Sequence, residues 1–148
     1  MPPVVTQITD LAALASRLRL SVFRASRTLR RESQADISPT LLAALATIDR
    51  HGPITPGDLA NHEQVRKPTV TRILNALADD GLIERSSDPL DGRVSWVSLS
   101  PAGRTLMRNV RRRTDRFLAH RLDELDPDDL AALDRAVEIL DRVTEPAE

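Results

Sequence analysis

Residues 66–103 read RKPTVTRILNALADDGLIERSSDPLDGRVSWVSLSPAG, and this stretch decides the fold. Apolar residues recur at helical spacing in its first part, strand-like runs flank a polar turn in its middle, and Ser-Pro restarts a helix at its end. The expected elements are a helix at 67–80 ended by Gly81, strands at 82–85 and 94–99, and a helix from 100 onward. A short helix beside an arginine-bearing hairpin favours DNA binding, because a helix fits the major groove and an arginine-tipped turn can reach the minor groove.

Three further helices are expected upstream of this stretch. The apolar residues of the first recur every three or four positions from Leu11 to Leu29, and Thr9 is a candidate N-cap. Ser38 is expected to cap the second helix, which places Leu41, Leu42, Leu45 and Ile48 inward and ends at His51-Gly52. Thr55-Pro56-Gly57-Asp58 predicts a short third helix, and residues 63–65 form a tight turn into the helix at 67–80.

Downstream, the helix that begins at Ser100-Pro101 is expected to run to about Leu125. Asp126-Pro127 then starts a last helix with Leu130, Leu133, Val137 and Leu140 on one face. The terminal helices carry long apolar stripes and leave little domain to bury them. Association with a second copy is the economical solution, and packing back on the same chain is the alternative.

The helix at 67–80 carries polar residues on the side away from its apolar stripe. Arginine can bind guanine O6 and N7, asparagine can bind adenine N6 and N7, and threonine suits a phosphate or a thymine methyl. The polar set comprises Lys67, Thr69, Thr71, Arg72, Asn75 and Asp79. An ordinary solvated helix face is the competing interpretation, and the tight turn before this helix favours DNA contact.

The hairpin tip holds Asp88, Asp91 and Arg93, and Ser95 follows on the same strand face as Arg93. A carboxylate two residues from an arginine can hold the guanidinium ready for an electronegative minor groove. A surface Asp–Arg pair that only decorates the turn is the alternative, and such a pair contributes about 0–1 kcal/mol.

The sequence resembles the multiple antibiotic resistance regulator (MarR) family of winged helix-turn-helix repressors. The resemblance covers nearly all 148 residues and is most specific in the hairpin string. The residues that carry it are Val70-Thr71-Arg72, Leu77, Gly81-Leu82-Ile83-Glu84-Arg85, Asp88-Pro89-Leu90-Asp91-Gly92-Arg93 and Val97-Ser98-Leu99-Ser100-Pro101-Ala102-Gly103. Gly92 stands where a basic residue is common, which weakens the wing contacts, and Ser100 stands where threonine is usual.

The resemblance implies a mostly α-helical fold with a small β-hairpin wing, in one MarR-like domain over residues 1–148. Residues 38–100 would form the winged helix-turn-helix, and 9–33 and 104–144 the interlocking dimerisation helices. It implies a homodimeric repressor of a palindromic operator, with Arg93 in the minor groove braced by Asp91, and an effector pocket for small aromatic or amphipathic molecules. The expected DNA contacts are Arg66, Lys67, Pro68, Thr69, Thr71, Arg72, Asn75, Arg85, Asp91, Arg93 and Ser95.

Composition bounds the other possibilities. The chain has no cysteine, which excludes disulfides, thiolate zinc sites and thiol-based peroxide sensing. Residues 1–10, MPPVVTQITD, lack a basic start and a long apolar run, and no stretch approaches the roughly 18 apolar residues of a membrane span. A cytoplasmic protein with no membrane partner, no cofactor and no enzymatic activity is expected.

Charge is unevenly distributed along the chain. From Arg17 to Arg121 there are 19 Lys and Arg residues against 11 Asp and Glu, whereas residues 122–148 hold 2 against 10. A basic body with an acidic tail can bind phosphate on one surface and avoid it on another. The arginines of 104–121 face several directions, and most are expected to be solvated or paired with the acidic tail across a dimer. Arg104, nearest the wing, is a phosphate candidate.

Several alternatives stay open. An RNA or single-strand binder would need a platform of stacked rings, and only Phe23, Trp96 and Phe117 are aromatic. An architectural DNA-binding protein without an effector and a helical interaction module are two more. Asp58 and His62 could share a metal, although a surface pair is the commoner arrangement. Arg17, Arg24 and His51 are effector-site candidates that nothing in the sequence singles out.

Overall fold

The computed structural model describes residues 10–144, which form six helices and one two-stranded antiparallel sheet. The helices are α1 (Leu11–Ser33), α2 (Pro39–His51), α3 (Pro56–Glu63), α4 (Lys67–Asp79), α5 (Pro101–Leu122) and α6 (Pro127–Thr144). The strands β1 (Ile83–Ser87) and β2 (Ser95–Leu99) form the wing. This mostly helical architecture with a β-hairpin wing confirms the expected fold class.

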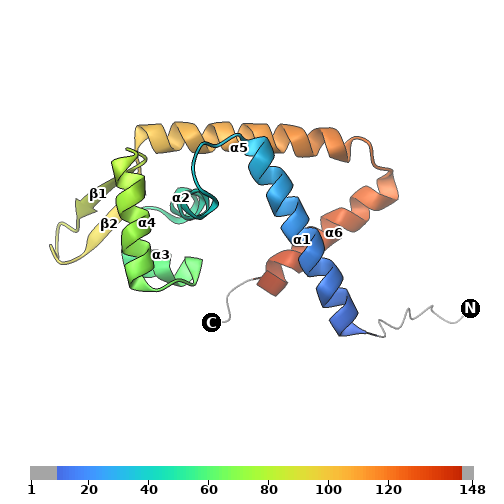
Figure 1. The fold of residues 1–148 in the computed structure, drawn as a ribbon, viewed down its shortest axis with the longest axis horizontal. Coiled ribbons are helices and arrows are strands. Elements are labelled where there is room, and N and C mark those ends of the chain that lie inside the picture. The colour runs from blue at the N-terminus through green and yellow to red at the C-terminus, as the bar shows by residue number, and fades with distance from the viewer. Residues whose placement is uncertain (1–9, 145–148) are drawn as a thin grey trace, which may run out of the picture.

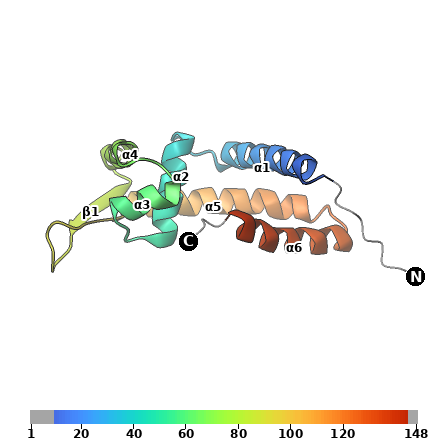
Figure 2. The same cartoon turned by 90° about the horizontal axis from the view of Figure 1, so that it is seen from below.

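The long helix α5 joins two differently packed parts of the molecule (Figure 1). At its start lie α2, α3, α4 and the wing, the end of α1 meets its middle, and α6 follows from its other end. The two outer helices cross in Figure 1, but Figure 2 shows them on opposite sides of α5. Helix α1 packs against α5, whereas no residue of α6 over 127–144 is buried. None of the helices in the described part of the chain is long and apolar enough to cross a membrane.

The hydrophobic core lies within the part formed by α2, α3, α4 and the wing. The four apolar residues of α4 that the periodicity turned inward, Val70, Ile73, Leu74 and Leu77, are all buried. They pack with Leu45 and Ile48 of α2, as expected, while Leu41 and Leu42 are only partly buried at the edge. Burial of one such side chain contributes about 1.5–3 kcal/mol, so this packing fixes the position of α4 relative to the wing.

Side-chain caps set most of the helix starts. Ser38 Oγ accepts a hydrogen bond from the Leu41 amide, and Thr55 Oγ1 accepts one from the Asp58 amide, as the sequence predicted. Asp10 caps α1 by accepting from the amides of Ala12 and Ala13. The predicted cap Thr9 lies outside the described residues, and Asp10, directly before the first turn, takes the role.

Element boundaries differ from the expectation at several places. Helix α4 ends at Asp79 instead of residue 80, and strand β1 begins at Ile83 instead of Leu82. Strand β1 continues to Ser87, because Ser86 and Ser87 pair with Trp96 and Ser95 although they are polar. Strand β2 begins at Ser95, one residue later than expected. Helix α5 ends at Leu122 instead of Leu125, where a turn closed by the Leu125 amide and the Leu122 carbonyl leads to the Asp126 cap of α6.

Candidate nucleic-acid interface

The outer face of α4 presents a cationic, hydrogen-bonding surface. Lys67, Thr71, Arg72 and Asn75 are exposed, as the helical periodicity predicted, because the opposite face is packed in the core. Thr69 is half-buried, since it lines a hollow of about 330 Å³ together with the cap Ser38 and with Thr40 and Leu41 of α2. Arg72 lines the same hollow. The arrangement offers an extended guanidinium and amide face of the size that a major groove admits.

The N-terminus of α4 differs from those of the other helices in its cap. Side-chain oxygens cap the other helices, at Asp10, Ser38, Thr55, Ser100 and Asp126. Arg66 precedes α4 and forms no side-chain capping bond. The helix dipole, Arg66 and Lys67 therefore add positive charge at this one end, which suits an anion such as a phosphate.

Arg85 of β1 reaches across to α4 and donates a hydrogen bond from Nη2 to Asn75 Oδ1 at 2.9 Å. The sequence placed both residues among the DNA contacts but did not predict that they contact each other. Only the hairpin register and the packing of α4 on β1 bring them together, across ten positions of the chain. The bond links the wing directly to the side chain expected to read a base.

Asp88 organises the wing loop. Its Oδ1 accepts hydrogen bonds from the amides of Leu90 and Asp91 at 2.8 and 3.1 Å, and its Oδ2 accepts one from Trp96 Nε1 at 2.9 Å. The bond from the indole, followed by those from the two amides, lowers the pKa of Asp88 below the usual value of an aspartate. The Trp96 contact was not predicted, although a tryptophan N–H in a hairpin needs an acceptor and Asp88 is the nearby candidate.

Asp91 acts differently from the expectation. Its Oδ1 accepts a hydrogen bond from the backbone N–H of Arg93 at 3.0 Å, and within residues 10–144 the structure gives no ion pair between the Asp91 carboxylate and the Arg93 guanidinium. The backbone N–H of Arg93 binds the carboxylate because the turn places the amide of residue i+2 next to the aspartate side chain. Asp91 thus shapes the loop, and the Arg93 side chain stays exposed at its tip. Ser95 begins β2 and is half-buried.

The Asp88–Trp96 bond predicts a pH-dependent wing. The pKa of Asp88 is lowered in the folded wing, so the stabilisation is present above the unfolded pKa and is lost as pH falls through the lowered value. Trp96 is the single tryptophan of the chain, and its emission should change in that acidic range. Fluorescence titration checks this, with far-UV circular dichroism to follow the helices. Asp88→Asn should lack the transition, and an identical titration in that variant would refute the assignment.

The arginines of α5 have partners within the chain more often than expected. Arg104 Nη1 donates to the Leu99 carbonyl at 2.8 Å, which ties this phosphate candidate to the end of β2. Arg111 pairs with Asp49 of α2, and Arg113 Nη1 donates to the Ser33 carbonyl at 3.2 Å. Arg121 contacts Glu124. The Arg111 contact holds α5 to α2, and the Arg113 contact holds α5 to the end of α1. These two arginines therefore do not pair with the acidic tail, although this was expected of most arginines in this helix.

The histidines do not form a metal site in the described residues. Asp58 Oδ2 accepts a hydrogen bond from Thr55 Oγ1 at 2.8 Å and serves the start of α3. His62 stacks on His51, with ring centroids 4.3 Å apart. Within residues 10–144 no group of three or more His, Cys, Asp or Glu residues is placed to hold an ion. The pairing of Asp58 with His62 around a metal therefore has no support from a third ligand.

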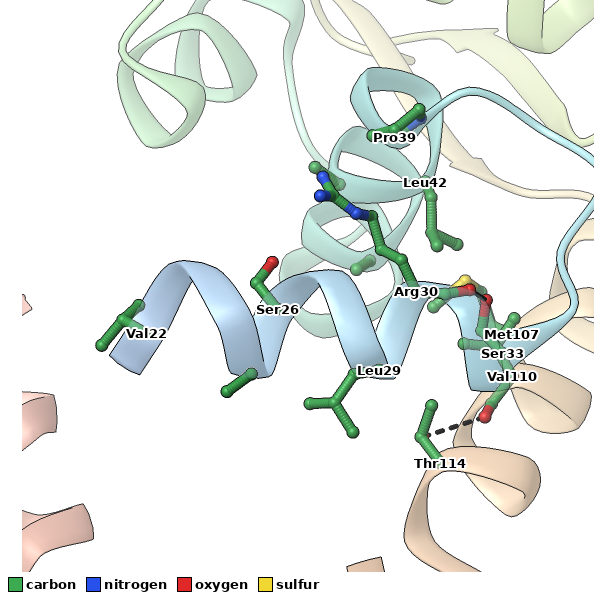
Figure 3. Close-up of a pocket in the computed structure, with 13 residues that line it drawn as sticks. Val22, Ser26, Leu29, Arg30, Ser33, Pro39, Leu42, Met107, Val110 and Thr114 are labelled. Atoms are coloured by element: carbon green, nitrogen blue, oxygen red, sulfur yellow. Dashed lines mark hydrogen bonds between the residues drawn. The ribbon is translucent and has the colours of Figure 1, made fainter. Parts of the chain in front are cut away.

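A pocket of about 540 Å³ lies between α1, α2 and α5 (Figure 3). Its walls are mostly apolar and include Leu29, Leu42 and Met107, while Arg30 extends from α1 toward α2. The effector candidates of the sequence, Arg17, Arg24 and His51, do not line it. Arg30 was missed because one arginine among the many of α1 carries no distinguishing pattern in the sequence.

Comparisons with known proteins agree with this geometry. Residues 37–95 match the sequence profile of the MarR family. An HTH-type transcriptional regulator of Mycobacterium leprae is 41% identical over 130 residues, covering 87% of this chain and 91% of that protein. The multiple antibiotic resistance protein MarR of Salmonella typhimurium is 33% identical over 103 residues, covering 69% and 72% of the two chains. The structure of Streptococcus pneumoniae FabT in complex with DNA superposes with a TM-score of 0.71 at 24% identity, over 88% and 92% of the two chains, and so supports the fold.

Members of this family are transcription regulators and not enzymes, which confirms the expectation of a non-enzymatic protein. The features that identify the family are the wing string, the preceding helix and the order of the flanking helices. The chain belongs to the MarR family of winged helix-turn-helix DNA-binding transcription regulators.

Proposed function

We propose that two copies of this chain bind a palindromic operator and repress transcription until a small effector releases them. The observation that carries the proposal is the exposed face of α4, with Arg72 and Asn75, beside a wing that presents Arg93. FabT of Streptococcus pneumoniae, a protein of the same fold, is known in complex with DNA, which supports the proposal of DNA binding. Two-fold symmetry would place half-sites about one helical turn apart, roughly 34–36 Å centre to centre.

The proposed dimer uses the terminal helices. Side chains along α1 and α6 leave large apolar surfaces uncovered, with Leu14 42% and Leu133 43% exposed. Contiguous apolar patches of this kind mark protein interfaces. Helix α1 is rich in arginine and α6 is rich in aspartate and glutamate, so the two helices are also complementary in charge across a pair of copies.

Substitution of the two proposed DNA-reading arginines should separate their roles. Arg72→Ala is expected to weaken operator binding by about 1–3 kcal/mol and to relax one base preference. Arg93→Ala is expected to weaken binding to all duplexes and to flatten the dependence of log K on log salt concentration. Fluorescence anisotropy with operator and random duplex measures both. Arg50→Ala, at the exposed end of α2, is the control and should bind as the wild type does. An Arg72→Ala protein that also binds as the wild type does would exclude direct readout.

We further propose that the pocket between α1, α2 and α5 holds the effector. Its apolar walls suit a ring or an alkyl group, and Arg30 can bind a carboxylate or phenolate. A ligand that binds better to the arrangement of helices that cannot engage DNA would shift the population and release the operator.

Selection of bound fragments from genomic DNA tests the operator proposal, and a repeat with small phenolic acids tests the release. The wild type is expected to enrich a palindrome without the phenolic acid and to lose this enrichment when the acid is added. Arg30→Met is expected to keep the enrichment in the presence of the acid. If the palindrome stays enriched with every compound tested, the protein binds DNA constitutively and the effector proposal is rejected. Absence of any enriched sequence, with competition by single-stranded nucleic acid, would reject the operator proposal itself.

A further inference from the structure

We propose that Arg85 determines base specificity without contacting a base, by fixing the orientation of the Asn75 carboxamide. This rests on the proposed reading of DNA by α4. The sequence interpretation treated Arg85 as a direct DNA contact. In the structure its guanidinium instead donates to Asn75 Oδ1, at 2.9 Å.

The two side chains come from a rigid frame. Asn75 lies on α4 between the buried residues Leu74 and Leu77, and Arg85 lies on β1 two residues after buried Ile83. The Leu82 amide donates to the Leu77 carbonyl at 2.9 Å, which holds the end of α4 to the start of the strand. The partners are therefore positioned by core packing and by a backbone bond, and only their side-chain torsions remain to be set.

The chemistry of the pair selects one orientation of the amide. A guanidinium has only N–H donors, so the carboxamide atom that faces Arg85 has to be the oxygen. An isolated asparagine can turn its amide by 180° at little cost, because the two ends have nearly the same size. The charge-assisted bond to Oδ1 favours one of these two states and directs Nδ2 away from Arg85.

A fixed amide reads fewer base edges than a free one. With Nδ2 directed outward and one lone pair of Oδ1 still open, Asn75 can donate to adenine N7 and accept from adenine N6. At a guanine the fixed amide would place Oδ1 opposite the O6 acceptor, which disfavours that base, whereas a flipped amide presents Oδ1 outward and can accept from the N4 amino group of cytosine. Loss of Arg85 should therefore broaden the preference at the base pair that Asn75 reads and leave the other positions of the half-site unchanged.

The test is a binding-site selection with the full chain, followed by affinity measurements on duplexes that vary at one position. Arg85→Met keeps a long apolar stem but removes the donors, Arg85→Lys keeps one charged donor, and Asn75→Ala removes the amide. Arg85→Met is expected to reduce discrimination on the order of tenfold at a single position in each half-site. Asn75→Ala should flatten the same position, the double variant should lose nothing more, and Arg85→Lys should restore part of the preference.

Two outcomes would overturn the inference. If Arg85→Met weakens binding to every sequence equally and flattens the salt dependence, Arg85 contacts phosphate. If the double variant loses the sum of the two single effects, the residues act separately. Exposed Arg108 provides the matched control, and Arg108→Met should leave the base preferences unchanged. The wild-type selection is read first, because a wild type without base preference would refute the proposed function, whereas the variants decide only the role of Arg85.

Discussion

Gly103→Ala is expected to lower the free energy of unfolding by about 3 kcal/mol, although alanine normally favours a helix. Gly103 lies buried in the first turn of α5, and a Cβ built there would be 2.0 Å from the Leu82 carbonyl oxygen. That oxygen cannot move aside, because it accepts a hydrogen bond from the Ser100 amide at 3.0 Å. Ser100 Oγ also donates to the Gly81 carbonyl at 2.6 Å. The substitution therefore forces α5 away from the junction between α4 and the wing.

Chemical denaturation at a fixed protein concentration measures this effect, since association with a second copy would make the stability depend on concentration. Gly57→Ala in the first turn of α3 is the matched control. Its Cβ would meet only Thr55 Oγ1, at 3.9 Å, so that variant should be neutral or slightly more stable. Equal stability of the Gly103 variant and the wild type would show that the junction is compliant. It would then be wrong to treat the position of the wing as fixed by this contact.

The parts of the fold that were predictable from sequence are those that depend on neighbours in the chain. Burial of Val70, Ile73, Leu74 and Leu77 follows from a 3.6-residue period, because one helix has only one face to turn inward. The cap at Ser38 follows from the competition of a short hydroxyl side chain for free amides. Gly81 has φ of +70°, as expected of the residue that ends α4.

The parts that were missed depend on how separate elements pack. Asn75–Arg85 and Asp49–Arg111 each join two elements, and an arginine has no sequence pattern that names its partner among many acceptors. The error at Asp91 has a different source. The Arg93 guanidinium was expected to bind the Asp91 carboxylate, although the backbone N–H of Arg93 lies closer to that carboxylate in a turn. The pocket around Arg30 likewise exists only once α1, α2 and α5 are assembled.

Leu133→Glu is expected to convert the proposed dimer into a monomer and to weaken operator binding more than 100-fold. No residue of α6 is buried within the single chain, yet its apolar residues keep the spacing of a packed face. A glutamate in such an interface would lose its hydration without a partner. A monomer binds each half-site independently, so it loses the gain in affinity that comes from linking two half-sites, which is a factor of about 10²–10⁴. Analytical ultracentrifugation and operator titration measure the two effects.

Ala131→Glu separates loss of the apolar contact from a change of charge, because it adds the same charge to the same helix. Residue 131 lies about 200° around the helix from 133, on the side of Arg135 and Glu138, so this variant should remain dimeric and bind normally. The core formed by α2, α3, α4 and the wing does not include α6, so both variants should keep the thermal unfolding transition of that core. A Leu133→Glu protein that stays dimeric would place the partner on another face, with the exposed leucines of α1 as the next surface to test.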